Sequence, residues 1–227
     1  MKREEVLSME YKGIEINWLH HDCFQINNGK TIVYTDPYKV QNTYKNADII
    51  VITHDHYDHM DLNSIKKLIT PKTQIVAQKD CKDALDPLEN EKMFVSPGEI
   101  VIIDGVRIEA VPSYNVNKFR QGNEVFHPKE KGNVGFIITI SGIRVYLAGD
   151  TDVIPEMENI RTDVALLPVS GIYVMTPEEA AQAAAIIRPS LAIPMHYGSG
   201  IGTEEDAEKF KKLLSGRIRV EILRSID

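Results

Sequence analysis

Cysteine and basic charge are both scarce in this chain of 227 residues. The two cysteines, Cys23 and Cys81, form neither a C-x-x-C pair nor a metal-finger spacing. We therefore expect no disulfide framework and a reducing, cytoplasmic setting. Lysine and arginine together number 26 against 33 aspartates and glutamates, which gives a formal net charge of -7. This balance disfavours nucleic acid as a partner, because long polyanions repel an acidic chain.

Long apolar runs are also missing. No run approaches the ~20 residues that a membrane helix needs. The opening MKREEVLSMEYKG is charged and has none of the apolar stretch that is typical of a signal peptide. We find no linker, low-complexity segment or short-period repeat. At 43% hydrophobic residues, the chain can bury one substantial core, so we expect a single domain over residues 1–227 and no membrane partner.

The apolar pattern predicts strands in pairs, followed by helices that alternate with strands. Turn residues at 27–30, 104–105 and 141–142 predict hairpins. Asp61 is expected to cap a helix over 62–69, and Thr176 to open an Ala-rich helix with Pro177 and Glu179 in its first turn. A continuous apolar strand over 47–53 is expected to be buried on both faces. Together these elements predict an α/β core of two sheets flanked by helices.

The stretch that follows this buried strand reads T-H-D-H-Y-D-H-M-D and is dense in histidine and carboxylate. His54, His56, Asp58 and His59 stand where α/β proteins gather ligands, just beyond the carboxyl end of a strand. Imidazole and carboxylate groups suit borderline divalent metals such as zinc. The alternative is a solvated polar loop with a chance cluster of histidines. Four convergent donors favour a metal site, and their close spacing suits two adjacent cations better than one.

Two further strand ends carry matching side chains. Asp150 follows the apolar strand RVYLA, and His196 follows LAIPM. Taken alone, the aspartate is more typical of a turn and the histidine of a satisfied core residue. Beside the H-x-H-x-D-H loop, a shared metal site becomes the better interpretation of both.

These motifs, H54-D-H56-Y-D58-H59, then G149-D150-T, then H196, resemble those of the metallo-β-lactamase superfamily over nearly the whole chain. The resemblance implies a four-layer αβ/βα sandwich with a dinuclear metal site. The opening W-L-H-H-D-C-F and T-D-P and the closing P-M-H-Y-G are most similar to the branch that contains L-ascorbate-6-phosphate lactonase. A more distant similarity is to the N-acylphosphatidylethanolamine phospholipases.

Carried over residue by residue, the resemblance implies two divalent metal ions, with zinc as the first choice and manganese as the second. His54 and His56 would hold the first ion, Asp58, His59 and His196 would hold the second, and Asp150 would bridge them. Two adjacent cations lower the pKa of a shared hydroxide and stabilise the charge that develops on the substrate. Asp58 would in addition accept the proton of that hydroxide. The implied activity is metal-dependent hydrolysis.

One position departs from the family pattern. A third histidine of the first metal is expected after the strand VRIEAVPSY, where this chain has Asn115. The next histidine is His127, in an excursion whose two ends approach each other if the flanking strands pair. His127 is our prediction for the missing ligand. The alternatives are the amide oxygen of Asn115 or an incomplete first site.

Four other residues are predicted to surround the metals. The resemblance implies that Asp36 supports the metal-binding loop through hydrogen bonds, against the alternative of a plain turn residue. His21 is expected at the mouth of the site, touching substrate or a metal ligand. Tyr173 and Tyr197 lie beside strand ends, where each could donate to a substrate oxygen or serve the structure alone.

The substrate class follows from the cationic centre. A small anionic molecule, such as a phosphorylated lactone, another small ester or a phosphodiester, presents a polarisable oxygen to two cations. Two competing hypotheses are a non-hydrolytic metal-binding sensor or scaffold and a nuclease or phosphodiesterase that acts on nucleotides. The sequence leaves open whether the chain forms a homo-oligomer.

Overall fold

The computed structural model describes residues 8–41, 44–198 and 200–226. They form two compact units, which are described separately. Unit one comprises the chain up to residue 94 together with the segment from residue 222 onward, and unit two comprises residues 95–221. The late segment belongs to unit one because the amide of Ile226 donates to the carbonyl of Trp18 at 3.2 Å.

Unit one contains a mixed sheet whose strands follow one another in sequence order. Strands β1 to β4 pair antiparallel through hairpins, and β4, β5 and β6 pair in parallel. The strands are β1 (Met9–Tyr11), β2 (Ile14–His20), β3 (Cys23–Asn27), β4 (Ile32–Thr35), β5 (Ile49–Ile52), β6 (Gln74–Gln78) and β7 (Lys92–Val95).

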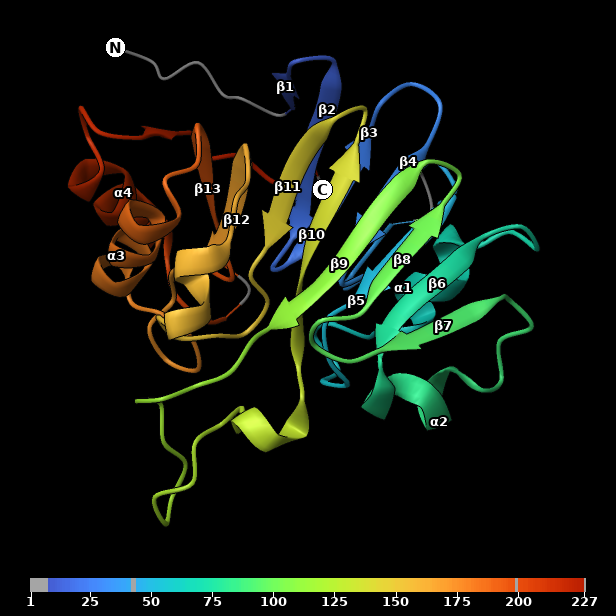
Figure 1. Ribbon diagram of the computed structural model, residues 1–227, viewed down its shortest axis with the longest axis horizontal. Helices are drawn as coiled ribbons and strands as arrows, with labels where there is room; N and C mark the ends of the chain where they lie inside the picture. Colours follow the sequence, from blue (N-terminus) through green and yellow to red (C-terminus); the bar gives the residue numbers. More distant parts are fainter. Residues whose placement is uncertain (1–7, 42–43, 199, 227) are drawn as a thin grey trace. The chain divides into compact units, whose positions relative to one another are not determined.

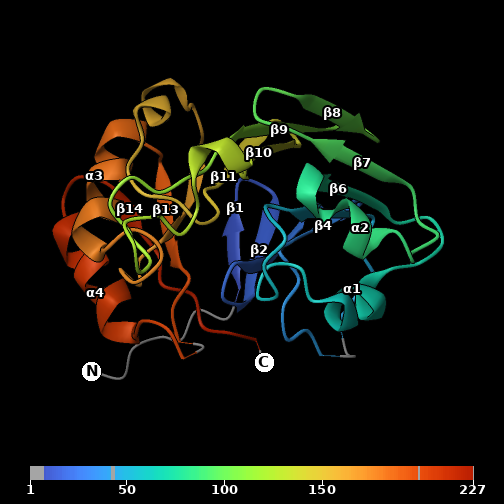
Figure 2. The same cartoon turned by 90° about the horizontal axis from the view of Figure 1, so that it is seen from below.

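The helices of unit one cover one face of its parallel strands. They are α1 (Leu62–Leu68), the 3-10 turn η1 (Lys79–Cys81) and α2 (Lys82–Leu85). Alternate residues Ile50 and Ile52 of β5 share a core cluster with Ile65 of α1 and Leu85 of α2, and Figure 2 shows both helices beside β4 and β6. Because all four residues of β5 are fully buried, the prediction of a strand buried on both faces is confirmed.

Unit two repeats this plan in its own sheet. Strands β8 to β11 form an antiparallel meander, and β11 to β14 pair in parallel. The strands are β8 (Ile100–Ile103), β9 (Val106–Pro112), β10 (Val134–Ile140), β11 (Ile143–Leu147), β12 (Val164–Pro168), β13 (Leu191–Met195) and β14 (Arg219–Val220).

The longer helices of unit two lie together against its parallel strands. Helix α3 (Pro177–Ile187) contacts β12 and the 3-10 segment η3 (Pro155–Asn159), while α4 (Glu204–Leu213) contacts α3 and β13. Figure 1 shows the two helices side by side in orange and red. A second 3-10 turn, η2 (Lys129–Lys131), lies between β9 and β10. No helix within the described residues has the length and apolar character to cross a bilayer.

Several local predictions are confirmed at the level of single hydrogen bonds. The Asp61 carboxylate accepts from the amides of Asn63 and Ser64 and so caps α1. Thr176 and Glu179 form a reciprocal capping box at the start of α3. The structure adds the short strands β1 and β7, which the sequence pattern did not predict. Near the end of the chain, the run over 217–223, in which charged and apolar residues alternate at first, forms only the two-residue strand β14.

Gly135 on β10 sets how closely β11 can approach. A Cβ at this position would lie 2.7 Å from the carbonyl oxygen of Leu147 and 2.8 Å from that of Ala148. Leu147 ends β11 and Ala148 follows it, on the stretch of backbone that leads to Asp150. Any side chain at position 135 would therefore displace the backbone that carries this carboxylate.

We expect Gly135→Ala to lower the free energy of unfolding by about 1–3 kcal/mol, the usual cost of overpacking a filled core. Thermal or urea unfolding measures the change. Thr139→Val on the same strand is the matched control, because it keeps the side-chain volume and should be nearly neutral. A Gly135→Ala protein as stable as the parent would contradict the steric argument.

Candidate metal centre

The loop that follows β5 gathers three histidines of unit one. It folds back through hydrogen bonds from the amides of His59 and Met60 to the carbonyl of His56, at 3.0 and 2.9 Å. The ring centroid of His54 then lies 4.5 Å from that of His56 and 4.1 Å from that of His59. His54 and His59 are buried, whereas His56 is partly exposed. A single tight turn therefore brings together the imidazoles that the sequence motif supplies.

Asp36 supports this loop from the end of β4. Its carboxylate is fully buried and accepts from the Thr53 amide at 2.8 Å, from the Thr53 hydroxyl at 2.6 Å and from Nδ1 of His59 at 2.8 Å. Burial raises the pKa of Asp36, and the hydrogen bonds from His59 and Thr53 oppose that rise. Because the Thr53 hydroxyl donates to Asp36, its oxygen can accept from Nδ1 of His54 at 3.0 Å. Nε2 is then the nitrogen through which either histidine would bind a metal.

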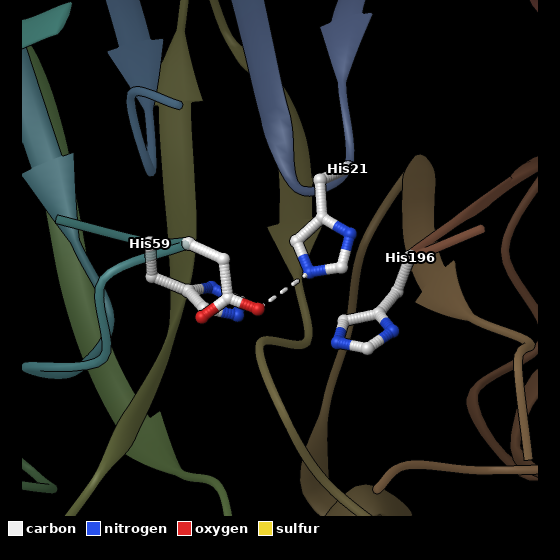
Figure 3. Close-up of side chains that lie close together, drawn as sticks. His21, His59 and His196 are labelled. Atoms are coloured by element: carbon white, nitrogen blue, oxygen red, sulfur yellow. Dashed lines mark ion pairs between the residues drawn. The ribbon is translucent and has the colours of Figure 1, made fainter. Parts of the chain in front are cut away.

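His21 joins these residues from the hairpin between β2 and β3. Its Nε2 lies 3.3 Å from Oδ2 of Asp58, and its ring meets that of His59 edge-on at 5.3 Å. Figure 3 shows His21 and His59 near each other, and its dashed line marks the ion pair of His21 with the carboxylate of Asp58. The ligand atoms of His21, Asp58 and His59 all lie within 4.8 Å of one another. Unit one thus holds three potential metal ligands in a small volume.

Asp22 is a residue of this cluster that the sequence argument missed. Its carboxylate is fully buried, and Oδ2 lies 4.0 Å from Nδ1 of His59. The available signal was its position, a carboxylate next to His21 in a tight turn between two buried strands. The pattern was not decisive, because aspartate is common in such turns for conformational reasons alone.

Asp150 occupies the corresponding place in unit two, three residues beyond the end of β11. Each of its carboxylate oxygens faces a different histidine. Oδ1 lies 3.3 Å from Nε2 of His196, and Oδ2 lies 3.3 Å from Nε2 of His127. All three side chains are buried. A carboxylate that points one oxygen at each of two imidazoles is arranged as a bridge between two cations would be.

Asn115 and His127 are joined by hydrogen bonds. The Asn115 side-chain oxygen accepts from the His127 amide at 3.0 Å and from its Nδ1 at 2.7 Å, and the Asn115 amide donates to the His127 carbonyl at 2.8 Å. The side-chain nitrogen of Asn115 donates to the Tyr173 carbonyl at 3.0 Å. Asn115 therefore orients the imidazole, whose Nε2 faces Asp150, and this geometry favours His127 over Asn115 as the metal ligand.

His196 is oriented in the same way at the end of β13. Its Nδ1 lies 2.9 Å from the Ser170 hydroxyl, and its backbone has a φ of 58°. The next residue, Tyr197, is buried, and burial raises the pKa of its phenol. The phenol therefore keeps its proton at neutral pH and carries no charge, so it can donate or accept a neutral hydrogen bond. The ring of Tyr173 instead packs edge-on against Phe126 at 4.7 Å.

The distances between these donors test whether they suit a metal. The three separations from a histidine Nε2 to a carboxylate oxygen are each 3.3 Å. Charge-assisted hydrogen bonds between such groups are shorter, at about 2.7–2.9 Å. A tetrahedral cation with ligands at about 2.0–2.1 Å separates neighbouring ligand atoms by about 3.3–3.4 Å. The spacing of both donor sets therefore fits a bound cation.

The burial of the carboxylates points the same way. Asp22, Asp36 and Asp150 are buried, and the ion-pair partners that the structure gives them are histidines. A buried anion is stable only when it is paired or coordinates a metal. Asp150, whose two oxygens each face a histidine Nε2 at 3.3 Å, lies where a divalent cation could pair with it.

Comparison with known proteins places the chain in a family. The model of the Beta-lactamase superfamily domain matches residues 15–196, and the chain therefore belongs to this superfamily. The expected fold class, an α/β protein with two mixed sheets and flanking helices, is confirmed. A metallo hydrolase from Ignicoccus hospitalis shares the fold, with a TM-score of 0.74 and 23% identity over 93% of this chain and 95% of that one.

Relatives of higher sequence identity show which class of proteins within the superfamily the chain belongs to. The chain is 34% identical over 219 residues to a UPF0173 metal-dependent hydrolase of Methanoculleus marisnigri, covering 92% of this chain and 93% of the relative. A protein from Parabacteroides distasonis, described as a metal-dependent hydrolase, superposes with a TM-score of 0.83 and 31% identity over 98% of this chain and 100% of that one. Within the superfamily the protein is thus one of the metal-dependent hydrolases.

Asp36→Asn should weaken metal binding without abolishing the fold. The amide cannot accept all three hydrogen bonds that hold Thr53 and His59, so the loop loses its orientation. Losses of this kind cost ~10–100-fold in metal affinity. Competition with a chromophoric chelator measures the effect. The control is Asp48→Asn, since Asp48 accepts from the amide of Ile32 outside the loop. Equal zinc affinities for the two variants would refute the role of Asp36.

The variants His127→Ala and Asn115→Ala should show which of the two residues binds the metal and which only orients the metal ligand. His127→Ala is expected to bind one metal fewer per chain, because the imidazole that faces Asp150 is lost. Asn115→Ala should keep the parent stoichiometry at saturating metal and lose only ~10–100-fold in affinity for one ion. Elemental analysis and metal titration give both numbers. The reverse pattern would show that the amide oxygen of Asn115 is the ligand.

Proposed function

We propose that the protein uses two divalent cations, with zinc as the first choice, to hydrolyse a small anionic ester, lactone or phosphodiester. The observation that carries the proposal is Asp150, whose two oxygens each face one histidine Nε2 at 3.3 Å. Membership of the superfamily supports the same arrangement. The proposed ligands of the first ion are His54, His56 and His127; those of the second are Asp58, His59 and His196; Asp150 bridges the ions.

When bound, two such ions would supply a nucleophilic water of lowered pKa and stabilise the negative charge that develops on the substrate. The remaining chemistry falls to side chains of the protein. Asp58 is proposed to accept the proton of the attacking water, because its carboxylate is partly exposed at 15% and borders His59 and His21. Asp36, Thr53 and Asn115 would hold the imidazoles in place, which limits the reorganisation that the reaction requires.

The loop that carries His127 supports an anionic substrate. Arg120 is exposed and donates to the carbonyl of Phe126, the residue before His127, at 3.1 Å. Its guanidinium also lies 5.5 Å from the centre of the Phe126 ring. The positively charged guanidinium of Arg120 is thereby held close to His127, a proposed metal ligand. Phe119 is exposed at 54% in the same loop and Ile172 at 51% beside Tyr173, so an apolar substituent on the substrate would also find a surface.

The branch resemblance refines the proposed substrate. Similarity of the opening and closing motifs to the branch of L-ascorbate-6-phosphate lactonase favours a phosphorylated lactone among the anionic esters. A lactone carbonyl and a phosphodiester both develop negative charge on an oxygen that two cations can stabilise. The panel that tests the proposal therefore contains lactones with and without a phosphate, phosphodiesters and thioesters.

We expect zinc- or manganese-loaded protein to hydrolyse at least one class of this panel, with the activity removed by a chelator and restored by metal. Asp58→Ala should lower the turnover number by ~10²–10⁴-fold, the usual contribution of a positioned acid or base. The control is Asp55→Ala, since Asp55 is an exposed carboxylate of the same loop. Turnover by Asp58→Ala at the parent rate, or parent protein that takes up no metal, would overturn the proposal.

A further inference from the structure

His21 adopts a backbone conformation that a side chain ordinarily avoids. Its φ of 53° lies in the left-handed region, which costs free energy for any residue other than glycine and is typically kept where function requires it. The Trp18 indole donates to the His21 carbonyl at 2.8 Å, and the pairing of β2 with β3 shifts register between Trp18 and His20. The hairpin is thus built to turn this imidazole inward.

The imidazole of His21 is closely surrounded by other side chains. It is 1% exposed and meets the rings of Tyr38 and His59 edge-on, at 5.9 and 5.3 Å. These contacts aim Nε2 at Asp58. The resulting 3.3 Å separation from Oδ2 contrasts with the 2.8 Å between His59 and Asp36, an imidazole–carboxylate hydrogen bond in the same unit. The longer distance matches the separation of two ligands on one cation.

From this geometry we propose that His21 is a direct ligand, through Nε2, of the cation that Asp58 and His59 hold. The proposal rests on the proposed function and adds a histidine that the superfamily pattern did not supply. Unit one by itself then offers two imidazoles and one carboxylate, a donor set that catalytic zinc sites use. In the metal-bound protein, the pair of His21 and Asp58 converges on the ion.

The test compares the same substitution at two adjacent histidines. Asparagine tolerates a positive φ better than most residues, so His21→Asn removes the imidazole while keeping the turn. His20→Asn is the control, because His20 ends β2 and is not proposed as a ligand. Zinc is the probe, and its affinity is measured by competition with a chromophoric chelator. Thermal unfolding of the metal-free proteins checks the fold, with a tolerance of about 4 °C in Tm.

Loss of a direct ligand should weaken one of the two zinc ions by more than ~100-fold, beyond the ~10–100-fold typical of an orienting residue. The other ion should keep its affinity, and His20→Asn should retain both. A loss of ~100-fold or less in His21→Asn would overturn the proposal. If this variant fails to fold without metal, His21→Gly, which tolerates the same φ without strain, is judged by the same threshold. A parent that binds fewer than two zinc ions would instead refute the proposed function.

Discussion

The buried carboxylate of Asp36 is the constraint on which the metal-binding loop depends. It accepts three hydrogen bonds, two from Thr53 where the loop begins and one from His59 where it ends. These bonds compensate for the burial of a charge that would otherwise be costly, and they hold both ends of the loop against β4. The backbone of Asp36 itself has a φ of 34° and donates to Val51 at 3.0 Å. The positions of His54 and His59 therefore follow from one buried anion.

In unit two, uncharged side chains orient the histidines. Asn115 accepts from Nδ1 of His127, and Ser170 bonds Nδ1 of His196. In both units an oxygen at Nδ1 fixes the ring, while Nε2 faces a carboxylate or is the nitrogen a metal would take. Neutral partners leave the imidazole less basic than a carboxylate partner would.

Much of the fold could be read from local patterns, because those patterns report local physics. The strand over 49–52 is apolar at every position since both of its faces are covered, and Asp61 and Thr176 cap helices through bonds that span three residues. Elements in which only a few residues pair were harder to predict. Strand β1 is a hairpin arm of three residues, and the run over 217–223 pairs with β13 for only two residues.

The sequence by itself determined the class of chemistry, because H-x-H-x-D-H behind a buried strand, with Asp150 and His196 at two further strand ends, has few uses other than binding metal. It could not decide between Asn115 and His127, and it left His21 at the edge of the site and Asp22 unnoticed. Those questions depend on side-chain direction. Tertiary structure turns Asn115 toward His127 and His21 toward Asp58, through a loop hydrogen-bonded on itself and a hairpin with positive φ, and spacing along the chain encodes neither.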